Sequence, residues 1–287
     1  MQELDDQRLR ERGVRLLLKR DDLIDAEVPG NKWRKLKYNL LTAEEQGHPT
    51  LLTFGGAYSN HVRAVAAAGQ ACGFRTIGVI RGEHTEPLNW SLTHATSQGM
   101  QLTYLDRETY RHKHEAGVLD ELRDRFGDFY LLPEGGSNAL AVRGCAELPA
   151  EITTAFDVIC CACGTGGTLA GIASGLKPGQ RALGFAVLKG GHFLDDDVAA
   201  LQQQAFGAAT DNWKINQEFH FGGFVKRTTK LDHFIADFQR RHGLHLDWIY
   251  VAKMLYGIFA LAERGDIPSG TIVIAVVTGP NEEPATP

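Results

Sequence analysis

The sequence predicts an α/β fold with mostly parallel sheets, and two observations support this prediction. First, continuous apolar runs such as PTLLTFGG (residues 49–56), FDVICCACG (156–164) and TIVIAVVTG (271–279) are typical of strands buried on both faces. Second, glycine-rich turns and helical patterns follow the first two runs, as in SNHVRAVAAAGQACG (59–73) and TLAGIASGL (168–176). Strands that alternate with helices favour parallel sheets. Ligands bind such sheets beyond the carboxyl ends of the strands, where these glycine turns lie.

The other elements follow in order along the chain. FRTIGVIRG (74–82) and RALGFAVLKGG (181–191) each predict a strand after a helix, and LDWIYVAKMLYGIFALAERG (246–265) predicts a helix before the last strand. The cysteine-rich run at residues 160–163 falls within one strand, where neighbouring side chains point to opposite faces. No His or second Cys pair follows it at zinc-ligand spacing. We therefore expect small core residues here and no metal site.

Composition and charge are those of an ordinary globular protein. Of the 287 residues, 43% are hydrophobic and 23% are charged, and the net charge is −5 with both signs interspersed. This balance gives no electrostatic footprint for nucleic acid. Residues 1–13 lack the apolar core of a secretory signal, and no run approaches the roughly 20 apolar residues that span a bilayer. We expect a cytoplasmic protein without a nucleic-acid or membrane partner.

The turn CGTGGTLAG (163–171) is the most informative, because it follows an apolar strand and opens a helix. Its glycines let backbone N–H groups approach an anion, and a helix N-terminus adds donors and a positive dipole. Thr165 and Thr168 can add hydroxyl donors. No Gly-Lys-Ser/Thr follows, and Leu169 replaces the third glycine of a dinucleotide motif. The turn favours a single phosphate over a nucleotide; a tight turn that binds nothing is the alternative.

A second turn, FGGAYSNH (54–61), has the same layout. Ser59 or Asn60 can cap the helix that follows, which is an ordinary structural role. The same side chains would also point into a cleft at the carboxyl edge of the sheet.

The segment VPGNKWRKLKYNL (28–40) holds three lysines and one arginine. If a helix starts near Lys32, its apolar residues share one face, and Arg34 and Lys35 point away from that face and are expected to be solvated. Lys32 and Lys37 both flank the apolar face, so periodicity does not choose between them. Position favours Lys32, because a helix N-terminus disfavours an ammonium group. Such a position suits an amine that loses its proton to act as a nucleophile or base.

Together, these motifs resemble those of pyridoxal-phosphate enzymes related to 1-aminocyclopropane-1-carboxylate (ACC) deaminase and D-cysteine desulfhydrase. The matching segments occur in the family's order and span nearly the whole chain: GNKWRKLKYNL, GGAYSNHVRAVAAA, LPEGGSNALAVRG, CGTGGTLAGI, FHFGGF, LDWIY and VVTG. The resemblance implies the fold type II architecture, similar to the tryptophan synthase β subunit. This architecture has two three-layer α/β/α domains with mostly parallel sheets, and pyridoxal phosphate binds in the cleft between them. The resemblance also implies a large domain of residues 1–36 and 144–287, a small domain of residues 37–143, and a homodimer.

The resemblance implies a role for each matching residue. Lys32 would bond covalently to pyridoxal phosphate and shuttle protons, Tyr250 would be catalytic, and Thr278 would lie near the pyridine nitrogen. The implied phosphate cup consists of Gly164, Thr165, Gly166, Gly167 and Thr168. Asn60 would hydrogen-bond the 3′ oxygen of the cofactor. The implied substrate side consists of Ser59, which is a further catalytic candidate, Asn60, His61, Phe224 and Tyr250.

Three positions depart from the family pattern. Val251 stands where ACC deaminases carry Glu and desulfhydrase-like members carry Thr, Phe224 stands where Tyr is common, and Trp248 replaces Pro. A carboxylate at position 251 would strengthen the electron sink of the cofactor more than a hydroxyl such as that of Thr278. Its loss weakens the case for opening the ring of ACC. We predict a small amino-acid substrate and a D-cysteine-type β-elimination that releases an oxo acid and ammonia.

Three alternatives stay open. The first is ACC ring opening to 2-oxobutanoate and ammonia. The second is a homologue that binds pyridoxal phosphate with little catalysis. The third is a phosphate-binding module without pyridoxal phosphate.

Overall fold

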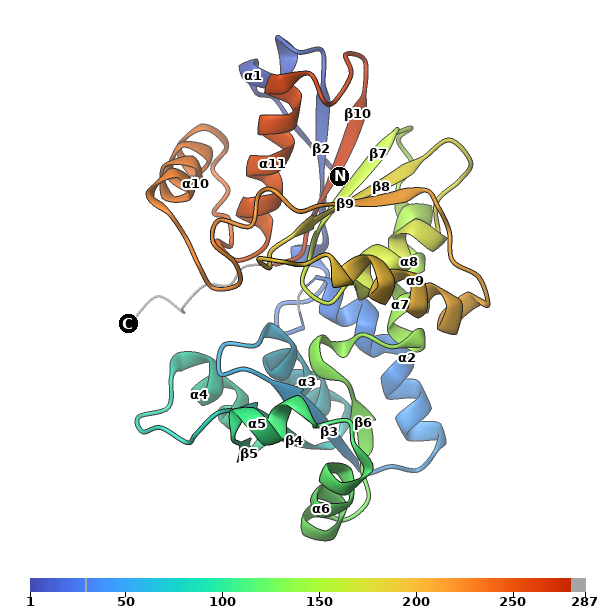
Figure 1. Cartoon of the computed structure of the whole chain (residues 1–287), viewed down its shortest axis with the longest axis vertical. Helices are drawn as coiled ribbons and strands as arrows, with labels where there is room; N and C mark the ends of the chain where they lie inside the picture. The colour runs from blue at the N-terminus through green and yellow to red at the C-terminus, as the bar shows by residue number, and fades with distance from the viewer. Residues whose placement is uncertain (29, 280–287) are drawn as a thin grey trace.

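The computed structural model describes residues 1–28 and 30–279 and contains two sheets, each lying between helices (Figure 1). The larger sheet has six strands in the order β1-β2-β10-β7-β8-β9, and every neighbouring pair is parallel except β1 with β2. Its strands are β1 (Gln2–Leu4), β2 (Arg15–Arg20), β10 (Ile272–Val277), β7 (Val158–Cys163), β8 (Arg181–Ala186) and β9 (Trp213–Asn216).

The smaller sheet has four strands, all parallel, in the order β5-β4-β3-β6. These strands are β5 (Gln101–Leu105), β4 (Arg75–Arg81), β3 (Thr50–Gly55) and β6 (Tyr130–Leu132). The central strand β3 is buried along its whole length. A strand that is covered on both faces has this continuous burial, which explains the unbroken apolar run in the sequence.

Helices cover both faces of each sheet, as the buried clusters and Figure 1 show. One face of the larger sheet packs against α1 (Gln7–Arg10), α10 (Thr229–His242) and α11 (Val251–Arg264). The other face packs against α7 (Ala139–Ala146), α8 (Gly167–Ser174) and α9 (Phe193–Phe206). The smaller sheet has α2 (Asn31–Glu45), α3 (Asn60–Cys72) and α4 (Trp90–Ser97) on one face, and α5 (Arg107–Arg111) and α6 (Ala116–Phe126) on the other. The described residues also form three short 3₁₀ turns: η1 (Asp21–Leu23), η2 (Glu134–Gly136) and η3 (Leu148–Glu151).

The predicted three-layer α/β/α arrangement with mostly parallel sheets is therefore confirmed. The cysteine-rich strand behaves as expected, since Cys160 packs on the α11 side of the sheet while Cys161 and Cys163 pack on the α8 side. All three thiols are buried and free. Within the described residues, no group of three or more metal-ligating side chains is placed to hold an ion.

The domain boundaries stay a prediction. The two sheets draw on the expected parts of the chain, but α2 runs without a break across the predicted boundary at residues 36 and 37. Its side chains pack in the core of the smaller sheet, and the same helix also contacts α7 beside the larger one.

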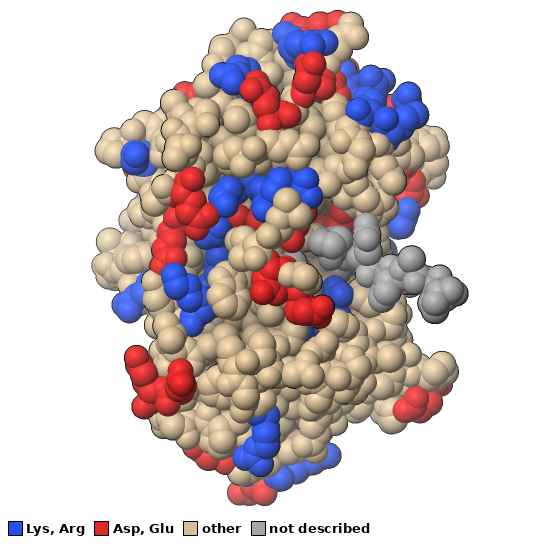
Figure 2. Space-filling view, turned by 180° about the vertical axis from the view of Figure 1, so that it is seen from behind, with Lys and Arg blue, Asp and Glu red and all other residues tan. Residues whose placement is uncertain are grey.

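The molecular surface mixes both charge signs, as Figure 2 shows for one face. In the part of the chain that the structure describes, no helix is both long and apolar enough to cross a bilayer.

Candidate active site

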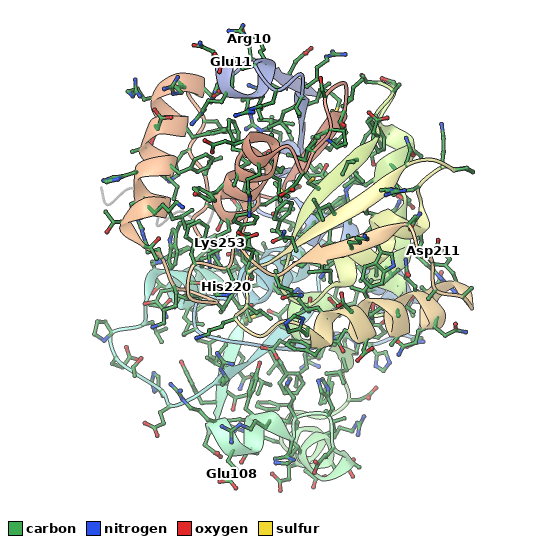
Figure 3. The ribbon with its side chains drawn as sticks, turned by 45° about the horizontal axis from the view of Figure 1, so that its top comes forward. Arg10, Glu11, Glu108, Asp211, His220 and Lys253 are labelled. Carbon is green, nitrogen blue, oxygen red and sulfur yellow. The ribbon has the colours of Figure 1, made fainter. Side chains whose placement is uncertain are left out.

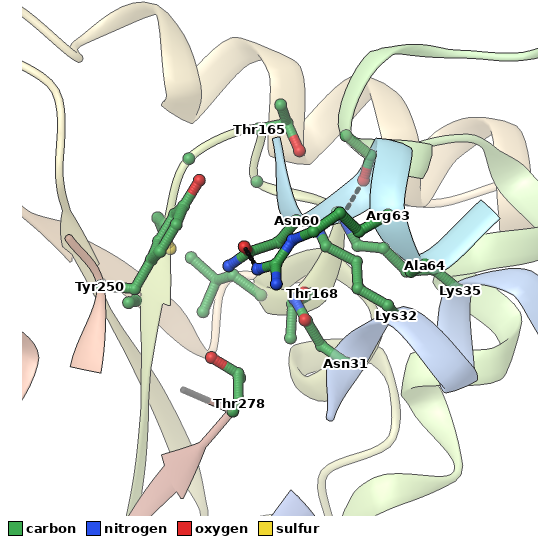
Figure 4. A pocket seen from close by; sticks show the side chains of 18 of the residues that line it. Asn31, Lys32, Lys35, Asn60, Arg63, Ala64, Thr165, Thr168, Tyr250 and Thr278 are labelled. Atoms are coloured by element: carbon green, nitrogen blue, oxygen red, sulfur yellow. Dashed lines mark hydrogen bonds between the residues drawn. The ribbon is translucent and has the colours of Figure 1, made fainter. Parts of the chain in front are cut away.

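A cavity of about 370 Å³ lies where the carboxyl ends of strands from both sheets meet. Figure 4 shows Tyr250 and Thr278 on one side of it and Lys32 and Lys35 on the other. Nine of the predicted site residues line this cavity: Lys32, Asn60, Tyr250, Thr278 and the five residues 164–168. The cavity thus joins segments that lie more than 200 residues apart in the sequence, as expected for a site at the strand ends of α/β sheets.

Lys32 enters the cavity from the first turn of α2. The helix is capped by Gly30, which has φ of 64° and lies so close to the last strand that an added Cβ would be 2.0 Å from the Thr278 carbonyl oxygen. Only glycine permits both this conformation and this approach. Burial, reinforced by the nearby Lys35 charge, lowers the pKa of the Lys32 amine to about 7. The part of Lys32 that stays accessible faces the cavity, so the amine is both desolvated and reachable.

Lys35 is buried, and the prediction that it is solvated is wrong. Its ammonium nitrogen Nζ donates to the Gly135 carbonyl oxygen and to Ser137 Oγ, both at 2.9 Å. The apolar face of α2 is wider than helical periodicity indicated, because α7 and η2 cover its neighbouring side. Lys35 therefore lines the cavity as a second, deeper cation, and burial lowers its pKa.

Arg34 is also buried, which corrects the second half of the same prediction. Its guanidinium contacts Asp21 (Nε to Oδ2, 2.6 Å) and Glu151 (Nη1 to Oε1, 2.7 Å). Asp21 is fully buried and also pairs with Lys19. These ion pairs fix the first turn of α2 against the end of β2, and so fix the backbone that carries Lys32.

The glycine turn at residues 164–168 forms the opposite end of the cavity. Gly166 is the N-cap of α8 with φ of 72°, and the first two residues of α8, Gly167 and Thr168, line the cavity. The N-terminal end of α8 therefore faces the cavity. An added Cβ at Gly167 would be 2.5 Å from Ser137 Oγ and 3.3 Å from Lys35 Nζ. Two threonine hydroxyls lie on this turn. Thr165 Oγ1 is 2.6 Å from Ser137 Oγ, and Thr168 Oγ1 accepts a hydrogen bond from the Asn31 side chain at 2.8 Å.

Tyr250 is the N-cap of α11, and its side chain faces the glycine turn. An added Cβ at Gly164 would be 3.3 Å from its ring. Burial raises the pKa of the Tyr250 phenol above its usual 10.0, and the negative charges of Asp247 and Glu134 add to this effect. The phenol therefore stays protonated at neutral pH.

Three predicted site residues do not line the cavity. Ser59 is the N-cap of α3, where its hydroxyl accepts from the Val62 amide. His61 is buried and does not line the cavity, and an added Cβ at Gly136 would be 2.7 Å from its ring. Burial lowers the pKa of His61 well below its usual value, so the ring is neutral.

Phe224 is the third predicted site residue that does not line the cavity. It is 41% exposed, and its ring packs edge to face against the Tyr250 ring, with the ring centroids 5.9 Å apart. Phe224 therefore reaches the cavity only through Tyr250.

Several lining residues were not predicted. Arg63 follows Asn60 by one helical turn, donates to the Asn60 side chain, and stacks at 4.4 Å over the Trp90 ring. Helical spacing from Asn60 could have identified Arg63. Trp90 and His94 come from α4, whose position only the folded chain reveals.

Glu27 lies opposite α4 at the same cavity, with Oε2 3.6 Å from His94 Nε2. This contact joins the loop before α2 to α4, and no sequence pattern indicated it.

The comparisons with known proteins agree with this geometry. The sequence profile of the family described as "Pyridoxal-phosphate dependent enzyme" matches residues 4–279. A protein of Pyrococcus horikoshii, provisionally named 1-aminocyclopropane-1-carboxylate deaminase, is 30% identical over 94% of this chain and 86% of its own length. The "Bifunctional D-cysteine desulfhydrase/1-aminocyclopropane-1-carboxylate deaminase, mitochondrial" of Arabidopsis thaliana is 28% identical over 86% of this chain and 67% of its own length.

Among solved structures, one described as an "ACC deaminase homologue" superposes with a TM-score of 0.84 at 29% identity. It covers 97% of this chain, and this chain covers 88% of that one. The resemblance to these enzymes is confirmed, and the chain belongs to the family of pyridoxal-phosphate-dependent enzymes.

Proposed function

We propose that this enzyme removes the β-substituent from a small amino acid of the D-cysteine type and releases an oxo acid and ammonia. The observation that carries the proposal is the pairing, in one cavity, of a lysine amine whose pKa is lowered to about 7 with an anion-binding glycine turn. The phenol of Tyr250 and the hydroxyl of Thr278 face the space between them.

The residues present fit pyridoxal phosphate. The cup formed by residues 164–168 needs glycine at position 167, because an added Cβ there would collide with the Ser137 side chain beside Lys35. Its N–H and hydroxyl donors suit a phosphate. Lys35 adds a buried positive charge that balances this anion. Asn60 would bind the phenolic oxygen of the ring and Thr278 the ring nitrogen. Bound pyridoxal phosphate supplies the electron sink that stabilises negative charge at the substrate α carbon.

The side chains of this protein then carry out the proton transfers. Lys32 Nζ would hold the cofactor covalently in the resting enzyme and, once substrate has displaced it, would accept the α proton; a pKa of about 7 leaves a large fraction of this amine neutral at neutral pH. Tyr250, which keeps its phenolic proton at neutral pH, donates it to the leaving β-substituent. Ser59 and His61 support the α3 end of the cavity from outside its lining, and Phe224 supports Tyr250.

Val251 favours β-elimination over ACC ring opening. It is the first residue of α11, is buried in the core and does not line the cavity. Among the described lining residues, Glu27 is the one carboxylate, and it pairs with His94. The ring nitrogen would therefore meet a hydroxyl instead of a carboxylate, and elimination of a good leaving group demands less of the electron sink. The names of the relatives keep ACC deaminase as the second candidate.

An absorbance-monitored screen of D-cysteine, ACC, D-serine and their L counterparts tests the proposal. We expect sulfide, ammonia and pyruvate from D-cysteine, and Tyr250→Phe should lower this turnover at least about tenfold. Tyr256→Phe is the matched control, because Tyr256 lies on the same helix but outside the cavity. Product from ACC alone would replace the proposal by its second candidate. A cofactor-loaded protein that is inert on every substrate would contradict both.

The proposal includes a homodimer, a cytoplasmic location, and the division into residues 1–36 with 144–287 and residues 37–143. Light scattering of the purified protein measures the first of these. A mass of one chain, about 31.5 kDa, would contradict the dimer.

A further inference from the structure

Lys253 is a fully buried lysine that lies outside the cavity. It sits in the first turn of α11, three residues after Tyr250, and its Nζ donates to the Gly223 carbonyl oxygen at 2.8 Å. Figure 3 shows Lys253 in the interior beside the loop that carries His220. Burying an ammonium group is costly, so a lysine here needs a reason beyond packing. Burial lowers its pKa to about 8 in spite of the neighbouring Asp247.

The loop that Lys253 holds, residues 220–226, has an unusual backbone. Phe221 and Val225 both have positive φ, at 52° and 53°, a region that residues with bulky side chains rarely adopt. Within the loop, the Gly223 amide donates to the His220 carbonyl, and the Gly223 carbonyl accepts from the Lys226 amide. The Lys253 contact ties this same carbonyl to α11. A backbone of this kind persists only where its surroundings hold it in place.

The loop of residues 220–226 contacts Tyr250. Phe224, the residue after Gly223, places its ring edge to face against the Tyr250 ring at 5.9 Å. The Tyr250 ring also lies close to Gly164, where an added Cβ would be 3.3 Å away. The phenol is therefore held between a fixed glycine turn and a loop whose position depends on Lys253.

A buried carboxylate fixes the backbone of the same tyrosine. The Asp247 side chain accepts hydrogen bonds from the amides of Ile249, Tyr250 and Val251, at distances from 2.7 to 3.2 Å. Asp247 thus sets the main chain of Tyr250, while the ring direction is left to the contacts of the side chain.

We propose that Lys253 is a positioning residue, which tethers the loop of residues 220–226 through Gly223 so that Phe224 holds the Tyr250 phenol toward the cavity. This inference rests on the proposed role of Tyr250. It assigns no contact between Lys253 and substrate or cofactor, since Lys253 does not line the cavity.

A double-mutant cycle in the holoenzyme tests the inference. Lys253→Met keeps the length of the side chain and removes the donor. We expect it to lower kcat at least about tenfold while KM changes less than about threefold, because a small misplacement of a proton donor is costly. In a Tyr250→Phe background the same change should cost less than about twofold, since residues that act through one another are not additive. Equal losses in both backgrounds would overturn the inference.

Two further variants separate positioning from general damage. Phe224→Ala removes the ring through which the loop contacts Tyr250. Because Phe224 is exposed, the variant should fold, and it should lower kcat more than it changes KM, with a smaller loss of kcat than Lys253→Met. This variant decides the question if Lys253→Met does not fold. Asp6→Asn is the control. Asp6 is a buried acid bonded to Arg8 and His242 at the far end of the same helical layer, and its loss should lower stability without changing kcat.

Hydrogen exchange supplies a readout that does not need turnover. In Lys253→Met holoenzyme we expect faster amide exchange in residues 219–226 and 247–251 and unchanged exchange in residues 163–174. Wild-type exchange in both of the first two segments would overturn the tether. If wild-type enzyme turns over none of the screened substrates, the proposed function fails, and hydrogen exchange alone decides whether the tether exists.

Discussion

The two sides of the cavity each present one reactive side chain from the start of a helix, but they fix that helix by different means. On one side, α2 presents Lys32, and ion pairs of Arg34 with Asp21 and Glu151 hold its first turn. On the other side, α11 follows Tyr250, and hydrogen bonds from backbone amides to Asp247 hold its first turn. The α2 side is held by side-chain charges, and the α11 side by backbone contacts and a tethered loop.

This difference suits the chemistry of each group. Lys32 must lose its proton, and burial, together with the charge of the nearby Lys35, lowers the pKa of its amine. Tyr250 must keep its proton, and the carboxylate of Asp247 beside it disfavours the phenolate. Burial is the main cause of both pKa shifts, and a neighbouring charge adds to each: Lys35 beside Lys32, and Asp247 beside Tyr250.

The largest expected effect comes from removing the amine on the α2 side. Lys32→Ala should abolish covalent attachment of the cofactor and all turnover, measured by absorbance and product release. Lys37→Ala is the matched control, because Lys37 lies on the same helix, is half-exposed and pairs with Glu147 at the end of α7. A Lys32→Ala protein that keeps wild-type turnover would show that α2 does not carry the nucleophile.

Breaking the ion pairs of α2 should cost stability. Arg34→Met leaves Asp21 buried with Lys19 as its only remaining cation among the described contacts. We expect a loss of about 3 kcal/mol in the free energy of unfolding, measured by urea titration. Arg123→Met removes an exposed pair with Asp120 and should cost less than about 1 kcal/mol. Equal losses in the two variants would mean that the buried pairs do not hold α2.

Lys35→Met should weaken cofactor binding without preventing it. The variant removes a buried charge beside the glycine turn, and hydrogen bonds to charged groups suggest a roughly thirtyfold rise in the Kd of pyridoxal phosphate. Fluorescence titration of the apoprotein measures this change. An unchanged Kd would contradict a role for Lys35 in phosphate binding and leave it only the structural role of bridging Gly135 and Ser137.

The smallest effect is a pH dependence on the α2 side. Attachment of the cofactor needs the neutral amine, so its rate should rise about tenfold between pH 6 and pH 8 and then level off, because the pKa of Lys32 is about 7. The folded-state pKa lies below the unfolded one, so burying this amine costs stability below pH 7, and the cost disappears as the pH rises toward 10.5. A midpoint near 10.5 would contradict a desolvated Lys32.

The sequence predicted the strands and turns more accurately than the burial of the charged side chains. Apolar runs identified the buried strands, and the glycine turn, Asn60, Tyr250 and Thr278 all line the cavity as predicted. The prediction was wrong for Arg34 and Lys35, because periodicity assigns a charged residue to solvent, whereas partners up to 117 residues away bury these two.

Two further features, the Lys253 contact and the start of α11, could not be predicted from the local sequence. Lys253 reads as an ordinary helix residue until the fold places Gly223 beside it. The helix predicted from Leu246 begins instead at Val251, because Asp247 turns the chain before it.

Borohydride reduction of the holoenzyme, followed by peptide mass mapping, tests the central claim most directly. The account predicts that the mass of the reduced cofactor appears on Lys32 and that Lys35, three residues away and also buried in the cavity wall, stays unmodified. Cofactor mass on Lys35, or on no lysine of α2, would contradict the account.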